Sequence, residues 1–135
     1  MTSERRVLLL KAAREDLDRL ARESLPLAKC ALVVLKKLEA GRLQGRLLDD
    51  RGSTGDLPDC RKLYFGLAPS LDSHRIVYKR RPNGDVEILE IVAVETREES
   101  YAYLLAAQRL GRLPESRRWW LSRVAARLGR SDPVS

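Results

Sequence analysis

Apolar positions in the first third of the chain recur at helical spacing after one short apolar run. Val7–Leu10 is that run, and its length suits a buried strand. Lys11–Glu23 then places apolar side chains at i, i+3 and i+4 beside a charged face. A second apolar stripe follows, with Ser24 as N-cap, Pro26 in the first turn and Gly41 as the stop. The pattern predicts a strand and a helical hairpin whose apolar side covers later strands.

The middle of the chain changes to strand-like runs separated by turn residues. Asp49–Asp59 is polar, rich in glycine and interrupted by proline, which predicts a loop. Arg61–Phe65 reads as a short strand, and Gly66–Ser73, broken by Pro69, reads as a second loop.

A β-hairpin is the strongest local signal. His74–Arg80 and Val86–Val94 flank an Asn83-Gly84 pair, which favours a tight hairpin turn. Because Val86–Val94 is almost entirely apolar, we expect it to be buried on both faces in the middle of the sheet.

A helix is expected after this strand. Thr96 and Glu99 have the spacing of a capping box, and the helix should run through Leu110 and stop at Gly111. The order of elements predicts an α+β fold, a small antiparallel sheet with an N-terminal helical hairpin packed on it and C-terminal helices.

The last segment, Leu113–Ser135, has its own character. Pro114 and Glu115 suit a helix start, and an apolar stripe follows, comprising Trp120, Val124 and Leu128 with Leu121 and Ala125 beside it. The rest is strongly basic, through Arg117, Arg118, Arg123, Arg127 and Arg130. One interpretation is a helix that docks its tryptophan side on the domain. The other is an arm that faces nucleic acid, with Trp119, which lies off the stripe, free to stack or bind a partner.

Charge narrows the range of partners. The chain has 135 residues and 26 Lys and Arg against 19 Asp and Glu, a net charge of +7. This balance favours RNA, DNA or an acidic protein, and it would also attract an anionic membrane surface. No apolar run is long enough for a membrane span, and Met1–Arg6 lacks the apolar core of a secretory signal, so we expect a cytoplasmic protein.

The metal-binding residue types are sparse. Cys30 and Cys60 do not form a CxxC pair, and His74, the single histidine, has no companions at metal-ligand spacing. We therefore expect two reduced thiols, no metal site and no cofactor.

Residues on these elements fit a known pattern. Lys62 follows Leu57-Pro58-Asp59-Cys60-Arg61, Arg75 opens an R-x-V-Y strand start, and Arg97 and Tyr103 lie at the start of the following helix. This arrangement resembles the RelE/ParE superfamily of bacterial type II toxins, and the RelE branch most. Tyr64 departs from the pattern, because the family has a second lysine there.

The resemblance covers roughly residues 7–110. It does not cover the C-terminal segment, so we divide the chain into a RelE-like toxin domain at 1–112 and a basic helical extension at 113–135. The resemblance implies a metal-independent, ribosome-dependent mRNA endonuclease that uses attack of the 2'-hydroxyl on the scissile phosphate. The implied partners are mRNA, the ribosome and an acidic antitoxin protein.

The resemblance also implies residue roles that the chemistry supports. Arg75 and Arg97 offer planar, permanently charged forks for phosphate oxygens, and Arg97 would deliver the leaving-group proton. Lys62 would stabilise the phosphate or act as the base, and Tyr103 would stack on a base or orient the hydroxyl. Tyr64 leaves the identity of the base open.

Further RNA contacts are expected outside this set. They are assigned to Tyr64, His74, Arg117, Arg118 and Arg123. A catalytic role for His74 is disfavoured, because neighbours on a strand point to opposite faces and Arg75 is next to it.

Each residue also has a purely structural interpretation. Lys62 would be a solvated strand lysine, Tyr103 would pack in the core, and the arginines would pair with Glu95, Glu98 or Asp72. Two functional alternatives stay open, a ParE-like toxin that inhibits DNA gyrase without nuclease chemistry and a non-toxic RNA- or protein-binding module. Tyr64 and the long Gly66–Ser73 loop favour the last.

Overall fold

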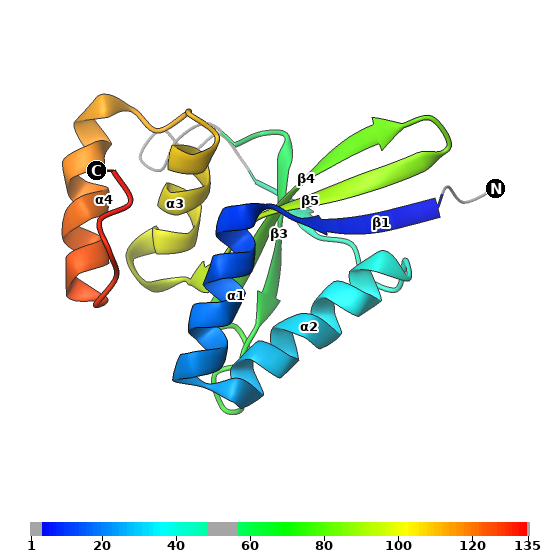
Figure 1. The fold of residues 1–135 in the computed structure, drawn as a ribbon, viewed down its shortest axis with the longest axis horizontal. Helices are drawn as coiled ribbons and strands as arrows, with labels where there is room; N and C mark the ends of the chain where they lie inside the picture. The colour runs from blue at the N-terminus through cyan, green and yellow to red at the C-terminus, as the bar shows by residue number, and fades with distance from the viewer. Residues whose placement is uncertain (1–3, 49–56, 135) are drawn as a thin grey trace.

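A five-stranded sheet forms the centre of the molecule. A computed structural model describes residues 4–48 and 57–134. The strand order is β1-β5-β4-β3-β2, and β1 runs parallel to β5 whereas the other neighbours are antiparallel (Figure 1). The strands are β1 Glu4–Leu9, β2 Arg46–Leu47, β3 Cys60–Phe65, β4 His74–Asn83 and β5 Val86–Thr96. The predicted α+β class is confirmed, and the parallel β1 makes the sheet mixed.

Helices cover both faces of the sheet. They are α1 Lys11–Glu23, α2 Leu25–Glu39, α3 Tyr101–Arg109 and α4 Glu115–Arg127. One core cluster joins α1 and α2 to one sheet face, and a second joins α3 to the opposite face. Figure 1 shows α4 beside α3, at the end of the molecule away from the β4–β5 hairpin.

The predicted helical hairpin is confirmed. α1 has the predicted bounds, and Ser24 caps α2 by accepting a hydrogen bond from the Leu27 amide at 3.4 Å. Gly41, just after α2, has a φ of +77°, which glycine adopts without strain.

The β4–β5 hairpin is confirmed as well. Asn83 pairs with Val86, and Gly84 in the turn has a φ of +63°. β5 lies between β1 and β4, so its second half is buried on both sides. Ile91 packs with the α1–α2 core and Ala93 with the α3 core.

The predicted capping box is wrong. β5 stays paired with β4 as far as Thr96, whose hydroxyl accepts from the Glu98 amide at 3.2 Å. A 3-10 turn then spans Glu98–Ser100, with Glu99 at φ +51° and Ser100 at φ +62°. Because Thr96 is paired with His74 in the sheet, it cannot be the N-cap of the following helix, and α3 starts only at Tyr101. Its stop at Gly111, with φ +70°, is as predicted.

Two features lie outside what the sequence pattern resolves. β2 has only two residues, too few for a period to be read. Residues 49–56 of the predicted Asp49–Asp59 loop lie outside the described residues, and Leu57, which follows them, is buried.

A buried ion pair joins α1 to α3. Asp16 is 1% exposed and accepts from both terminal nitrogens of Arg109, at 2.6 and 2.8 Å. The Val94 amide donates to the same carboxylate at 2.9 Å, and Arg19 at 3.1 Å. Arg109 thus has a structural partner that accounts for its charge.

The C-terminal helix docks on the domain. Leu121, Val124 and Ala125 are fully buried against residues of α3, whereas Trp120 and Leu128 are partly buried at the edge of that contact. The sequence placed Trp120, Val124 and Leu128 at the centre of the apolar stripe, with Leu121 and Ala125 beside it. In the structure Leu121, Val124 and Ala125 form the buried centre. No helix in the described ranges is long and apolar enough to cross a membrane.

Candidate functional site

Four of the sequence-predicted residues meet on the sheet face that α3 covers. Lys62 and Tyr64 alternate along β3 with buried Leu63, which packs in the α1–α2 core on the other face. In the β3–β4 register, Tyr64 lies opposite Arg75. Tyr103 reaches this face from α3. We call Lys62, Tyr64, Arg75 and Tyr103 the arginine–tyrosine cluster.

Arg75 is the centre of the cluster. Its guanidinium carbon lies 3.9 Å from the centre of the Tyr64 ring, a stacked cation–π contact. Its Nε donates to the Tyr103 hydroxyl at 2.9 Å, and its Nη1 donates to the backbone carbonyls of Asp72 and His74. With 8% of Arg75 exposed, these contacts fix the position of a buried cation.

Lys62 places a second cation beside the first. Its Nζ lies 5.7 Å from the Tyr64 ring centre and 5.8 Å from the Tyr103 ring centre. Both distances are within cation–π range. Tyr64 is 41% exposed and Tyr103 is 5% exposed, so the cluster opens to solvent on its Tyr64 side.

Arg97 reaches the margin of the cluster through Asp72. It precedes the 3-10 turn, and its amide donates to the Ser73 carbonyl at 3.1 Å. Its guanidinium, about half exposed, pairs with the Asp72 carboxylate at 3.3 Å. Asp72 therefore contacts both arginines, Arg75 through its backbone carbonyl and Arg97 through its side chain.

The sequence identified Asp72 only as a neutralising partner. The signal that could have indicated its contact with Arg75 is its position three residues earlier, at the end of a loop. The Arg75 guanidinium turns back along the chain and donates to the Asp72 carbonyl. The ring of Tyr103 packs in the core, as in its structural interpretation, and its hydroxyl accepts from Arg75, a contact that the sequence did not predict.

His74 is not brought into the cluster. Its ring centre lies 5.3 Å from that of Phe65, which belongs to the α1–α2 core, and its Nδ1 shares a hydrogen bond with the Ser73 hydroxyl at 2.8 Å. Burial lowers the pKa of His74, although nearby Glu95 opposes the shift. The imidazole is therefore neutral at neutral pH.

The α4 arginines form a separate surface. Arg117, Arg118 and Arg123 are exposed on α4, whose apolar side is buried against α3. In Figure 1, α3 lies between α4 and the sheet. Of the further RNA contacts that the sequence predicted, Tyr64 lies in the cluster, the three arginines lie on α4, and His74 lies in neither.

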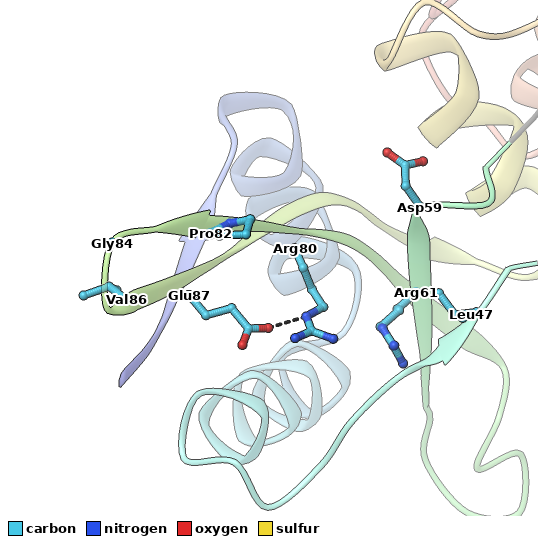
Figure 2. A pocket seen from close by; sticks show the side chains of 8 residues that line it. All are labelled: Leu47, Asp59, Arg61, Arg80, Pro82, Gly84, Val86 and Glu87. Atoms are coloured by element: carbon cyan, nitrogen blue, oxygen red, sulfur yellow. Dashed lines mark hydrogen bonds and ion pairs between the residues drawn. The ribbon is translucent and has the colours of Figure 1, made fainter. Parts of the chain in front are cut away.

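A hollow at the hairpin end of the sheet contains none of the predicted residues. Its lining includes Arg61, Arg80 and Glu87, shown from close by in Figure 2. Arg80 is ion-paired with Glu87, and Arg61 donates to the Gly45 carbonyl at 2.8 Å. Arg61 also lies opposite Tyr78, a residue of the α1–α2 core, so this hollow is on the other face from the cluster.

The cluster suits an anionic ligand. Lys62 and Arg75, with Arg97 at the margin, supply three cations, and the exposed ring of Tyr64 offers a face to a nucleotide. Among residues 4–48 and 57–134, no three His, Cys, Asp or Glu side chains are grouped as metal ligands would be.

Comparison with known proteins places the fold. Family models and curated protein sequences give no match. A mutant of the E. coli toxin RelE in the free state matches with a TM-score of 0.50 and 22% identity, covering 82% of this chain and 99% of that one. A YoeB/ParE toxin from Agrobacterium tumefaciens also matches with a TM-score of 0.50, at 14% identity, over 68% of this chain and 98% of that one.

These two neighbours carry the names of different toxins and score equally, so the fold does not select a branch. Each neighbour is covered almost completely, whereas each leaves some part of this chain unmatched. The chain has the fold of the RelE and YoeB/ParE toxins, as its sequence predicted.

Proposed function

We propose that this chain is a RelE-like toxin that cuts mRNA on the ribosome without a metal ion. The observation that supports the proposal is the fixed position of Arg75, which stacks on the Tyr64 ring and donates to the Tyr103 hydroxyl. Lys62 contacts the same two tyrosines, and Arg97 lies at the margin. A gyrase inhibitor acting by binding alone has no need of a cation held this rigidly.

The reaction needs three functions from the protein. A base takes the proton of the ribose 2'-hydroxyl, O2' attacks the phosphorus, and the bond from phosphorus to O5' breaks as an acid protonates O5'. The products are a 2',3'-cyclic phosphate and a free 5'-hydroxyl. Cations must stabilise the phosphorane that forms between these steps.

Arg97 and Arg75 differ in exposure, and we propose different roles for them. Arg97 is accessible and is the arginine that a phosphate meets first, while Arg75 supplies fixed positive charge from beneath the Tyr64 ring. By resemblance, Arg97 also delivers the proton to O5'. Lys62 or Tyr64 takes the 2'-hydroxyl proton, and the exposed ring of Tyr64 stacks on a base.

Asp72 must release Arg97 for this reaction. The carboxylate and the guanidinium are both about half exposed and 3.3 Å apart, a geometry that stabilises a protein by about 0–1 kcal/mol. A phosphate can therefore replace Asp72 at little cost. The Asp72 carbonyl continues to hold Arg75 when its side chain moves away.

The proposed cellular partner is an acidic antitoxin. The net charge of +7 favours an acidic protein, and a hollow between β1, α1 and α2 combines exposed Leu8 and Leu32 with Arg14 and Lys36. An amphipathic acidic segment fits that composition. We place the protein in the cytoplasm, where ribosomes translate mRNA, with 1–112 as the toxin domain and 113–135 as the basic extension.

Inhibition of DNA gyrase is the alternative. The match to a YoeB/ParE toxin with the same TM-score favours it as the second candidate. A non-toxic binding module is the third, consistent with Tyr64 at the position of a family lysine.

One experiment separates the three. Purified protein is added to a translating extract and to ribosome-free mRNA, with and without a chelator, and RNA ends are mapped. Separately, gyrase supercoiling is measured. The proposal requires chelator-resistant breaks that carry 2',3'-cyclic phosphates and occur only in translating mRNA. Intact RNA together with inhibited supercoiling would identify a gyrase inhibitor. Intact RNA together with normal supercoiling would favour the non-toxic binding module.

A further inference from the structure

The outer side of α4 carries an exposed tryptophan beside exposed arginines. Trp119 is 57% exposed and lies off the buried side of the helix, which is formed by Leu121, Val124 and Ala125. An exposed indole offers a partner both an apolar ring face and a polar N–H.

Neighbouring side chains hold the indole in place. The Trp119 and Trp120 ring centres are 5.9 Å apart with planes at 78°, an edge-to-face contact. Trp120 is itself partly buried against the α3–α4 core, and its ring lies 5.2 Å from the Arg127 guanidinium carbon. Arg127 is paired with Glu99 at 2.7 Å. The contact with Trp120 therefore limits the movement of the exposed Trp119 ring.

One cation lies beside Trp119 and is available to a ligand. The Arg123 guanidinium carbon lies 5.5 Å from the Trp119 ring centre. Arg117, Arg118 and Arg123 are exposed, and none of them forms an ion pair within the part of the chain that the structure describes. Arg127, on the same helix, is by contrast neutralised by Glu99.

We propose that this face of α4 binds single-stranded RNA, with an unpaired base stacked on Trp119 and the flanking phosphates on Arg123, one turn further along the helix, and on Arg118 at the border of the face. An aromatic ring bordered by cations is the pattern by which proteins hold unpaired nucleotides. A duplex offers phosphates but no free base face, so it engages only the arginines. The identity of the ligand as RNA rests on the proposed function, whereas the surface can be tested by binding alone.

The test measures the affinity of the full chain for a labelled single-stranded RNA of about 10 nucleotides, within the site size of such surfaces. The same strand in a duplex is measured in parallel, each at several salt concentrations. Arg97→Ala is the common background, so that the accessible arginine proposed to bind phosphate on the sheet does not contribute to the measured affinity. The variants are Trp119→Leu, Trp119→Phe and the pair Arg118→Gln with Arg123→Gln. Leu25→Ala, another exposed apolar residue, on α2, is the matched control.

Trp119→Leu should weaken single-strand binding about tenfold, leaving duplex binding and the salt slope unchanged. Trp119→Phe should retain most of the affinity, because a phenyl ring still stacks. The double arginine variant should lower the single-strand salt slope by about 0.7 for each phosphate that the protein no longer neutralises. Leu25→Ala should bind like the parent protein.

Wild-type single-strand affinity in Trp119→Leu would overturn the inference, as would an equal loss of duplex binding. A polyglutamate peptide that binds the parent and loses affinity in Trp119→Leu by a larger factor than RNA does would identify a protein-binding surface instead. These outcomes are independent of cleavage. Failure of the proposed function would appear as intact mRNA in the translating extract, whatever the strength of RNA binding to α4.

Discussion

Arg130 donates two hydrogen bonds to the buried carboxylate of Glu95, from Nε to Oε2 at 3.0 Å and from Nη2 to Oε1 at 2.9 Å. Glu95, on β5, is 2% exposed, and Arg130 follows α4. Arg130 also pairs with Glu23 at the end of α1 at 2.8 Å. This arginine therefore ties the C-terminal segment to the sheet and to the helical hairpin.

Arg130→Met should destabilise the fold by about 3 kcal/mol, because it removes two hydrogen bonds from the buried Glu95 charge and leaves that charge to Arg19 and the Thr96 amide. Urea unfolding should show a lower midpoint with an unchanged slope. Arg127→Met is the matched control. It removes an exposed ion pair and should cost less than about 1 kcal/mol. Equal losses in the two variants would contradict the anchoring role of Arg130.

The same carboxylate should make stability depend on acid. Burial alone would raise the pKa of Glu95, but hydrogen bonds from Arg130 and the Thr96 amide hold it below the ordinary value of 4.5. A carboxyl group with a lowered pKa in the folded state contributes stability above its unfolded pKa. That contribution disappears as the pH falls through the folded pKa.

The free energy of unfolding should therefore decrease from about pH 5 downwards, and Glu95→Gln should flatten part of this decrease. Urea unfolding of both proteins over the acid range provides the comparison. Parallel pH profiles for the two proteins would show that Glu95 is not the titrating group responsible.

Asp72→Asn should release Arg97 without disturbing Arg75, since the Asp72 carbonyl remains. Loss of an exposed ion pair worth up to about 1 kcal/mol predicts RNA binding up to about fivefold tighter. Cleavage should persist at wild-type rate or above. A fall in cleavage to the level of Arg97→Ala would instead identify the Asp72 carboxylate as a participant in the chemistry.

Lys62 and Tyr64, both on β3, are the two candidates for the base that takes the 2'-hydroxyl proton. If Lys62 takes the proton, Lys62→Met should suppress cleavage, because a thioether cannot accept it, while Tyr64→Phe retains the ring and most of the activity. Single-turnover rates on ribosome-bound mRNA distinguish them. Loss of activity in Tyr64→Phe with Lys62→Met unaffected would transfer the role to Tyr64.

Much of the fold follows from local pattern. Both helices of the hairpin, the β4–β5 turn and the stop at Gly111 could be predicted, because periodicity, caps and turn residues act over a few positions. The capping box failed because pairing of Thr96 with His74 extends β5, and strand pairing is a non-local interaction.

The candidate site divides in the same way. Alternation along the strands predicted that His74 and Arg75 face opposite sides. The contact of Arg75 with Tyr103 and the bridge through Asp72 join segments whose separation along the chain leaves no periodic signal. Glu95 was considered a partner for Arg75 or Arg97, yet the fold brings Arg130 to it.

Cleavage by the arginine–tyrosine cluster is the central claim, and mapping mRNA ends in a translating extract tests it most directly. Wild-type protein should produce discrete breaks. Arg97→Ala, which removes an exposed side chain, should abolish them with thermal stability unchanged, and Arg75→Lys should slow cleavage about 100- to 1,000-fold by losing the fixed fork. Breaks of undiminished rate in both variants would contradict the claim.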